Sequence, residues 1–204
     1  MISILSYGCG NISSIANMFR VLGIETRIAE TPEQVLEAEK LILPGVGAFD
    51  YGMGRLHEAG LLDALNQVAH EKRIPVLGIC LGMQLMCRMS EEGKLPGLGW
   101  IDADVKRFAF SEEQQHLKVP HMGWNSLQIV RENPIVVPEG MRQRFYFVHS
   151  YFVRCNDAGD VLATSHYGHD FVASFHRDNL YGVQFHPEKS HRYGLALMKH
   201  FGEL

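Results

Sequence analysis

The chain of 204 residues has few cysteines, no long apolar run and no excess of basic side chains. Its four cysteines form no C-x-x-C pair, which favours a reduced, cytoplasmic protein over a secreted one held by disulfides. No apolar stretch approaches the roughly 18 residues of a membrane span, and the first residues lack the basic region of a signal peptide. Because 19 basic and 23 acidic side chains leave a net charge of −4, we expect neither a nucleic acid nor a membrane as partner.

The first 90 residues alternate short apolar runs with amphipathic stretches. The apolar runs predict strands at 2–5, 25–28, 41–43 and 76–79. Amphipathic patterns at 12–22 and 61–69 predict helices between these strands. One helix start is clear, because Thr31, Pro32 and Gln34 stand in the order of an N-cap, a first-turn proline and a capping-box glutamine. This alternation predicts a parallel sheet with right-handed crossovers.

From about residue 100 the pattern changes to closely spaced strands. These are expected at 105–108, 127–130, 145–148, 161–164, 171–175 and 180–185, with turn signals between them, one of which lies at 138–140. We expect this half to be mainly antiparallel, with a polar loop at 110–118 and a closing helix at 190–202. Residues 1–204 are therefore predicted to form a single α/β domain. Its open, mostly parallel sheet has helices on both faces and antiparallel strands added in the second half.

A sharp reversal is expected at Cys80, where the apolar run 76–79 stops and a helical pattern begins. Gly78 and Gly82 flank the cysteine at two residues on either side, which is the spacing of a nucleophile elbow. Glycine fits there because the tight turn strains the central residue and leaves no room for flanking side chains. The turn exposes the thiol beside a helix N-terminus, whose free N–H groups stabilise a thiolate and an oxyanion. Taken alone, the stretch also fits a buried cysteine at a strand end.

Two further glycine-rich turns follow predicted strands, at 8–11 and 44–47. Because the carboxyl ends of parallel strands meet at one edge of a sheet, we expect both turns to lie near Cys80. The first turn does not complete the G-x-G-x-x-G pattern of a dinucleotide site, since Ser13 stands where the third glycine is required. A nucleotide site is therefore not expected there.

His186 ends the last apolar run and is followed by Pro187 and Glu188. Proline fixes the backbone, and residues two apart in an extended chain point the same way, so Glu188 can orient the His186 ring. Together with Cys80 these residues would make a cysteine–histidine–acid arrangement, in which the acid fixes the tautomer of the imidazole. Taken alone, the segment also fits a strand-end turn with a surface glutamate.

Three motifs in chain order carry a resemblance to a known family. They are Pro44-Gly45-Val46-Gly47, Gly78-Ile79-Cys80-Leu81-Gly82-Met83-Gln84 and Gln184-Phe185-His186-Pro187-Glu188. This set resembles the class I (triad) glutamine amidotransferases, whose fold is flavodoxin-like, and the match covers essentially the whole chain. Within that class, the chain most resembles the glutaminase subunit of imidazole glycerol phosphate synthase. The closer resemblance rests on Tyr7-Gly8-Cys9-Gly10-Asn11, Pro120-His121-Met122-Gly123-Trp124-Asn125 and His186-Pro187-Glu188-Lys189-Ser190.

The resemblance implies an enzyme that hydrolyses the side-chain amide of L-glutamine to glutamate and ammonia. Cys80 would attack the amide and form a thioester. His186 would donate a proton to the leaving ammonia and then act as base for water, while Glu188 would hold the ring. The catalytic residues implied are therefore Cys80, His186 and Glu188.

The same resemblance implies where the oxyanion and the substrate lie. One oxyanion donor would be the backbone N–H of Leu81, and the other would come from the segment that holds Val46 and Gly47. Glycine on both sides of Val46 permits a peptide flip that would switch activity. The residues implied to bind the substrate are Gly45, Gln84, His149, Ser150 and Tyr151.

Ammonia released by so small a glutaminase would have to pass to a partner. The resemblance implies a cyclase subunit with a (β/α)8 barrel, which pairs with this chain as a heterodimer. That pair makes imidazole glycerol phosphate and aminoimidazole carboxamide ribotide in histidine biosynthesis. Asn11, Trp124 and Lys189 lie on motifs that face the partner. We expect no cofactor, and no metal either, because the pair His166 and His169 lacks a completing ligand set.

Two alternatives remain at this point. The segments 12–17 and 186–194 also resemble a paralogous glutaminase that supplies ammonia to a surface-polysaccharide sugar amidotransferase, and the shared chemistry leaves that choice open. An alternative of another class is a DJ-1-like cysteine hydrolase or a non-catalytic regulatory domain. Such proteins share the elbow but lack the combination of Gly82-Met83-Gln84 with His186-Pro187-Glu188.

Overall fold

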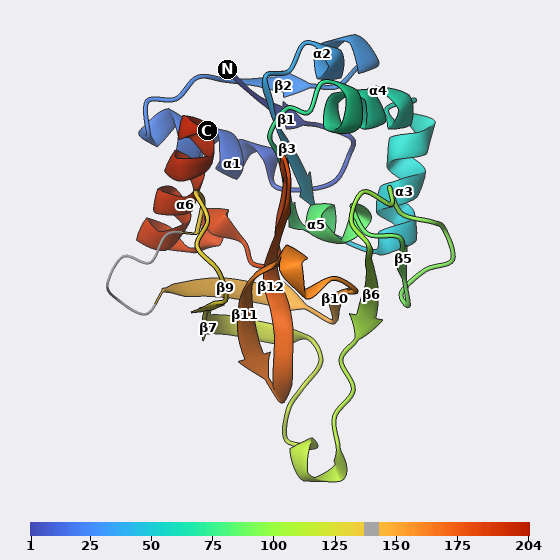
Figure 1. Cartoon of the computed structure of the whole chain (residues 1–204), viewed down its shortest axis with the longest axis vertical. Coiled ribbons are helices and arrows are strands. Elements are labelled where there is room, and N and C mark those ends of the chain that lie inside the picture. Colours follow the sequence, from blue (N-terminus) through green and yellow to red (C-terminus); the bar gives the residue numbers. More distant parts are fainter. Residues whose placement is uncertain (137–142) are drawn as a thin grey trace.

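The computed structural model describes residues 1–136 and 143–204 (Figure 1). The strands are β1 (Ile2–Leu5), β2 (Thr26–Ala29), β3 (Lys40–Gly45), β4 (Val76–Cys80), β5 (Met89–Ser90), β6 (Ala103–Arg107), β7 (His121–Ser126), β8 (Gln128–Ile129), β9 (Arg144–His149), β10 (Tyr151–Cys155), β11 (Val161–Tyr167), β12 (His169–Arg177) and β13 (Leu180–Val183). The helices are α1 (Ile12–Val21), α2 (Pro32–Leu36), α3 (Phe49–Glu58), α4 (Leu62–Asn66), α5 (Leu81–Leu85) and α6 (His191–Glu203). Single turns of π or 3₁₀ helix lie at Gln67–Glu71, Glu112–Gln114, Ala158–Asp160 and Pro187–Lys189.

In these two ranges, eleven strands form one sheet in the order β2-β1-β3-β4-β13-β12-β10-β6-β5, with β11 and β8 joined beside β12. Strands β2, β1, β3, β4 and β13 run parallel to one another, whereas β12 pairs in antiparallel fashion with both β13 and β10. Strands β7 and β9 form a separate antiparallel pair. The predicted parallel first half and mainly antiparallel second half are both present. Strand β13 belongs to the second half of the chain but pairs with the parallel strands of the first. It pairs with β4, which brings the residues after β13 beside the end of β4.

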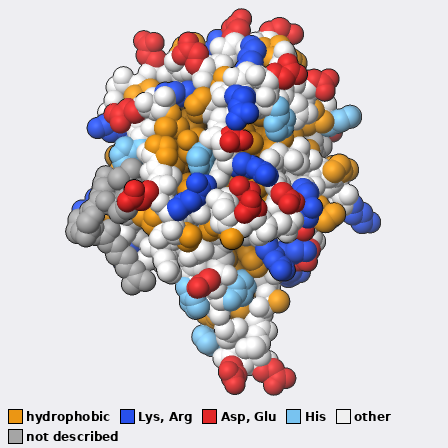
Figure 2. All heavy atoms as spheres, viewed as in Figure 1, with side chains coloured by type: hydrophobic (Ala, Val, Ile, Leu, Met, Phe, Trp, Pro, Cys, Tyr) orange, Lys and Arg blue, Asp and Glu red, His pale blue; other side chains and the backbone are white. Residues whose placement is uncertain are grey.

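Helices cover both faces of the parallel part of the sheet. Apolar side chains of α1 and α6 pack on one face, and those of α2, α3, α4 and α5 pack on the other. The clearest helix start is present, since Thr31 and Gln34 form the expected capping box. Figure 2 shows acidic and basic side chains interspersed on the surface in that view. Among the described residues, no helix is both long and apolar enough to cross a bilayer.

Several elements differ from the sequence-based prediction. Helix α3 was not expected, because Gly52 and Gly54 weaken its helical pattern. Strands β7 and β10 were also missed, and the helix after Cys80 is only five residues long. The polar segment 110–118 is mostly exposed, as predicted, but contains the 3₁₀ turn. The turn predicted at 138–140 lies outside the described residues.

Candidate active site

The nucleophile elbow forms where β4 meets α5. Cys80 has φ 53° and ψ −109°, a conformation that is strained for a residue with a side chain. A Cβ on Gly82 would lie 1.8 Å from the carbonyl oxygen of Leu43, and one on Gly78 would lie 2.8 Å from that of Gly82. Only glycine fits at both positions, as the spacing predicted. Helix α5, which follows the cysteine directly, is only five residues long.

The turn at 44–47 lies directly beside the elbow. Gly45 pairs with Cys80 in the parallel register of β3 and β4, and a Cβ on Gly45 would lie 2.8 Å from the amide nitrogen of Gly82. The hydroxyl of Tyr7 donates to the carbonyl of Pro44 at 2.7 Å. A Cβ on Gly10, in the first glycine-rich turn, would lie 2.8 Å from the Pro44 side chain. The three glycine-rich turns therefore meet at one sheet edge, as the alternating pattern predicted.

His186 reaches the elbow because β13 runs parallel to β4 and ends beside it. Its Nδ1 lies 2.9 Å from Oε1 of Glu188, and both side chains are 3% exposed. The carboxylate accepts from Nδ1, which leaves Nε2 free of any hydrogen-bond partner among the described residues. Burial lowers the pKa of His186, but contact with the thiol of Cys80 and with Glu188 raises it by more, so that the net shift is upward.

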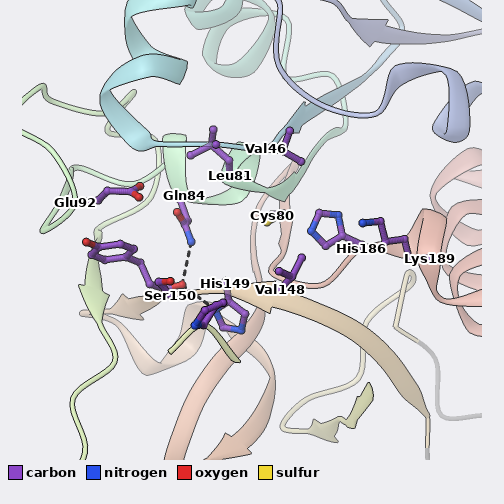
Figure 3. Close-up of a pocket in the computed structure, with 13 residues that line it drawn as sticks. Val46, Cys80, Leu81, Gln84, Glu92, Val148, His149, Ser150, His186 and Lys189 are labelled. Carbon is purple, nitrogen blue, oxygen red and sulfur yellow. Dashed lines mark hydrogen bonds between the residues drawn. The ribbon is translucent and has the colours of Figure 1, made fainter. Parts of the chain in front are cut away.

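The turn between β9 and β10 forms the opposite wall. Nδ1 of His149 donates to the carbonyl oxygen of Tyr151 at 2.8 Å, and Nε2 of Gln84 donates to the same oxygen at 3.1 Å. Burial lowers the pKa of His149 to about 3, so its ring is neutral. Figure 3 shows Gln84 on one side of Cys80 and His186 with Lys189 on the other.

A cavity of about 530 Å³ joins these walls, which is ample for a small amino-acid substrate. Its lining is Val46, Gly47, Cys80, Leu81, Gln84, Glu92, Pro120, Val148, His149, Ser150, Tyr151, His186 and Lys189. Of the residues predicted for catalysis, oxyanion or substrate binding, Gly45 and Glu188 do not line it. Gly45 packs behind the elbow, and Glu188 lies behind the imidazole ring.

The residues predicted to face a partner occupy different positions. Asn11 is exposed just before α1. Trp124 is 40% exposed and stacks on His191 at 5.5 Å between ring centroids, so it is not a core residue. Lys189 lines the cavity and lies over the ring of Tyr146, whose ring also contacts Trp124.

Two polar residues at the site were not assigned from the sequence. Gln184 is fully buried, and its Nε2 lies 3.7 Å from Sγ of Cys80. Glu92 lines the cavity and accepts from the N–H of Phe49, at the start of α3. Gln184 belongs to the third motif, which was the one signal available for it, whereas nothing in the pattern around Glu92 marks it. Among the residues described, no group of three or more His, Cys, Asp or Glu side chains could hold a metal ion.

The fold and the elbow define the class of protein. The family model described as glutamine amidotransferase class-I matches residues 4–202, and the chain belongs to this family. The chain is therefore a glutamine amidotransferase enzyme with glutaminase activity, as predicted. A solved glutamine amidotransferase has a TM-score of 0.70 at 21% identity, with 97% of this chain and 98% of that chain covered. PurLQS from Thermotoga maritima has a TM-score of 0.73 at 17% identity, with 98% and 96% covered. At such identities these structures show the fold alone.

Curated relatives resemble the chain over its full length. The imidazole glycerol phosphate synthase subunit HisH 2 of Pseudomonas aeruginosa is 49% identical over 204 residues, which is 100% of both chains. The subunit HisH 2 of Methanococcus maripaludis is 48% identical over 98% of both chains, and HisH of Leptospira interrogans is 44% identical over 100% of both. The predicted resemblance to the glutaminase subunit of imidazole glycerol phosphate synthase is confirmed.

Proposed function

We propose that the chain acts as one unit, the glutaminase subunit of an imidazole glycerol phosphate synthase. In this role it hydrolyses L-glutamine and passes the ammonia to a cyclase subunit. The observation that carries the proposal is the cavity in which Cys80 lies between the His186–Glu188 pair and the turn at 149–151. The chain is 49% identical over its whole length to a relative of that name, which supports the assignment to this subunit.

The side chains can carry out the reaction in two halves. The thiolate Sγ of Cys80 attacks the carboxamide carbon, the C–N bond breaks, and the proton on Nε2 of His186 goes to the departing ammonia. The glutamyl group is then bound to Sγ as a thioester. Water then attacks the thioester, His186 takes its proton, and the thiolate leaves. Glu188 keeps Nδ1 protonated throughout, so that Nε2 faces the reacting atoms.

The oxyanion formed in each half needs two N–H donors. Leu81 begins α5 and lines the cavity, which supports its N–H as one donor. The second comes from the turn that holds Val46 and Gly47, which also line the cavity. Val46 is 46% exposed, and Gly47 has φ +107°, with open space out to 4 Å where a Cβ would stand. The turn therefore has room to rotate a peptide, and binding of the partner is proposed to set that peptide.

Ammonia is useful only where it is consumed, so we propose a cyclase partner with a (β/α)8 barrel, bound as a heterodimer. Asn11, Trp124 and Lys189 are the proposed contacts, and Lys189 also lines the cavity from which ammonia would leave. A cytoplasmic location stays a prediction from the cysteine pattern.

An electrophilic glutamine analogue tests the nucleophile. We expect the complex with the cyclase to be labelled at Cys80 and to lose glutaminase activity in step with labelling. Cys155→Ser is the control, because this partly exposed cysteine lies outside the cavity and its loss should leave labelling unchanged. A folded complex that hydrolyses no glutamine, with Cys80 unlabelled, would sink the proposal.

A binding experiment separates the two branches of glutaminase. The tagged chain should retain a histidine-pathway cyclase, and glutaminase turnover should rise when the cyclase and its ligand are added. Retention of a sugar amidotransferase instead would favour the paralogue that supplies surface polysaccharides. Equal turnover with and without the partner would contradict the proposed control of the 44–47 turn.

A further inference from the structure

A buried amide contacts the sulfur of the nucleophile. Gln184 follows β13, is 0% exposed, and places Nε2 3.7 Å from Sγ of Cys80. Its Oε1 accepts from Nε2 of Gln84 at 3.0 Å. Gln184 is therefore fixed at both ends of its amide, and one end points at the reacting atom.

The polarity of the neighbouring groups dictates which end that is. The carbonyl oxygen of Tyr151 can only accept, so the amide of Gln84 must turn its Nε2 toward it. The second hydrogen of that nitrogen is donated to Oε1 of Gln184. Because Oε1 is thus turned toward Gln84, the N–H of Gln184 faces Cys80 and donates to the sulfur.

The Tyr151 carbonyl is itself held by a chain of neutral histidines. His149 donates to it from Nδ1, so Nε2 of His149 must accept from Nδ1 of His121, at 3.0 Å. Nε2 of His121 then accepts from the side-chain amide of Asn125 at 3.3 Å. Burial lowers the pKa of His121 to about 4, so this ring, like that of His149, carries the single N–H that the chain requires.

We propose that Gln184 is a further catalytic residue, whose amide N–H stabilises the Cys80 thiolate and orients it for attack. Gln84, His149 and His121 are positioning residues that keep the amide in this orientation. A hydrogen bond to a charged acceptor is stronger than one to a neutral acceptor, so the thiolate gains more than the thiol. The inference rests on the proposed glutaminase function, because it assigns a role in activating that enzyme's nucleophile.

Two titratable groups also act on the thiol and would stay in place in the test. His186 follows β13 and Tyr7 follows β1, and both side chains interact electrostatically with Cys80. A replacement at 184 leaves both of these groups intact. A change in thiol reactivity would therefore report on the amide.

The test is the pH dependence of alkylation by iodoacetamide, followed by mass spectrometry on the peptide that holds Cys80. Gln184→Met keeps the length of the side chain and removes the N–H. We expect the profile to move to higher pH and the rate near neutral pH to fall about tenfold, the size of one hydrogen bond to a charged group. Glutamine hydrolysis in the cyclase complex should lose kcat, with KM nearly unchanged.

Ser174→Ala is the matched control, because Ser174 is also fully buried, lies on the adjacent strand β12, and has no hydrogen-bond partner among the described residues. It should keep the wild-type profile. If Gln184→Met does not fold, Gln84→Met, which frees Oε1 of Gln184, should shift the profile in the same direction by less.

A wild-type profile in folded Gln184→Met, or in Gln84→Met where the first variant does not fold, overturns the proposal. Failure of the proposed glutaminase function can be distinguished from failure of the role proposed for Gln184. In that case the wild-type chain would not hydrolyse glutamine with any partner, while the alkylation profiles would still report whether Gln184 acts on the thiol.

Discussion

Gly82 in the elbow at 76–84 and Gly47 in the turn at 44–47 lie in neighbouring segments, yet glycine is needed at the two positions for different reasons. At the elbow, Gly82 is required for space, because a Cβ would overlap the carbonyl oxygen of Leu43. At the turn, Gly47 has open space around it but a positive φ, which residues with side chains rarely adopt. Glycine is therefore required at position 82 by close packing and at position 47 by the backbone conformation.

This difference indicates how the site is built. The elbow at Cys80 is held by close packing around Gly78 and Gly82, and the pair His186 and Glu188 beside it is buried. Val46 is nearly half exposed and has no such packing. Control of the enzyme is therefore expected at the turn, and four experiments test this contrast.

The largest expected effect is on folding at the elbow. Gly82→Ala should destabilise the chain by about 3 kcal/mol, because the added methyl meets backbone rather than a movable side chain. Gly54→Ala, in α3, has open space and should change stability by about 1 kcal/mol or less in the favourable direction. Urea unfolding measures both. Equal midpoints for the two variants would remove the distinction between packed and open glycines.

The next effect concerns the N–H group at the turn. Val46→Pro removes the backbone N–H of Val46, which we take as the second oxyanion donor. Glutaminase kcat in the cyclase complex should then fall by about 10²–10³. Stability should change little by comparison, because the side chain is exposed. Val46→Ala keeps the N–H and should retain most of the activity. If both variants lose activity equally, the side chain rather than the peptide N–H carries the role.

A third effect tests whether the pair behind the elbow is charged. The pKa of His186 is raised in the folded chain, so the stabilisation from its charge is complete below the unfolded value of about 6.5 and is lost as the pH rises through the raised value. Glu188→Gln removes one of the two groups that raise it. The difference in unfolding free energy between wild type and variant should therefore be larger near about pH 6 than near about pH 9.

The control for that experiment is Glu58→Gln, which removes an exposed partner of Arg55 and should give a small difference at both pH values. A Glu188→Gln difference that does not shrink with rising pH would contradict the raised pKa of His186. Chemical denaturation at the two pH values measures all three proteins.

The smallest effect on the isolated chain is expected at Trp124. Its ring is 40% exposed and stacks on His191, so Trp124→Ala should cost less than about 1 kcal/mol of stability. Affinity for the cyclase should fall about tenfold or more, as for an aromatic residue central to an interface. Val130→Ala, another exposed apolar position, is the control. Unchanged affinity in Trp124→Ala, measured by calorimetry, would remove this residue from the proposed interface.

Much of this architecture follows from local signals. The elbow was predictable because glycines two residues before and after Cys80 are typical of a tight strand-to-helix turn, and the capping box at Thr31 and Gln34 was equally clear. Helix α3 was not, since its two glycines lower helix propensity and its formation depends on packing of Phe49 and Leu56 in the core.

The network of hydrogen bonds around the elbow could not be predicted from the sequence. Gln84 lines the cavity, where binding of the substrate stays a prediction, and its Nε2 is shared between Tyr151 and Gln184, which was not predicted. His149 was implied to bind the substrate and His121 belonged to a motif of the resemblance, but their mutual contact was not predictable because it depends on the pairing of β7 with β9. Such contacts join residues far apart in the chain, and no spacing rule records them.

The local sequence determines that the chain reverses at Cys80, because glycine spacing and strand–helix alternation act over a few residues. The groups that surround the Cys80 thiol are determined by the tertiary structure. The parallel pairing of β13 with β4 places Gln184 and His186 beside it, across about a hundred residues of chain. Register and packing are properties of the whole sheet, and they turn a reactive cysteine into a site with a directed hydrogen-bond network.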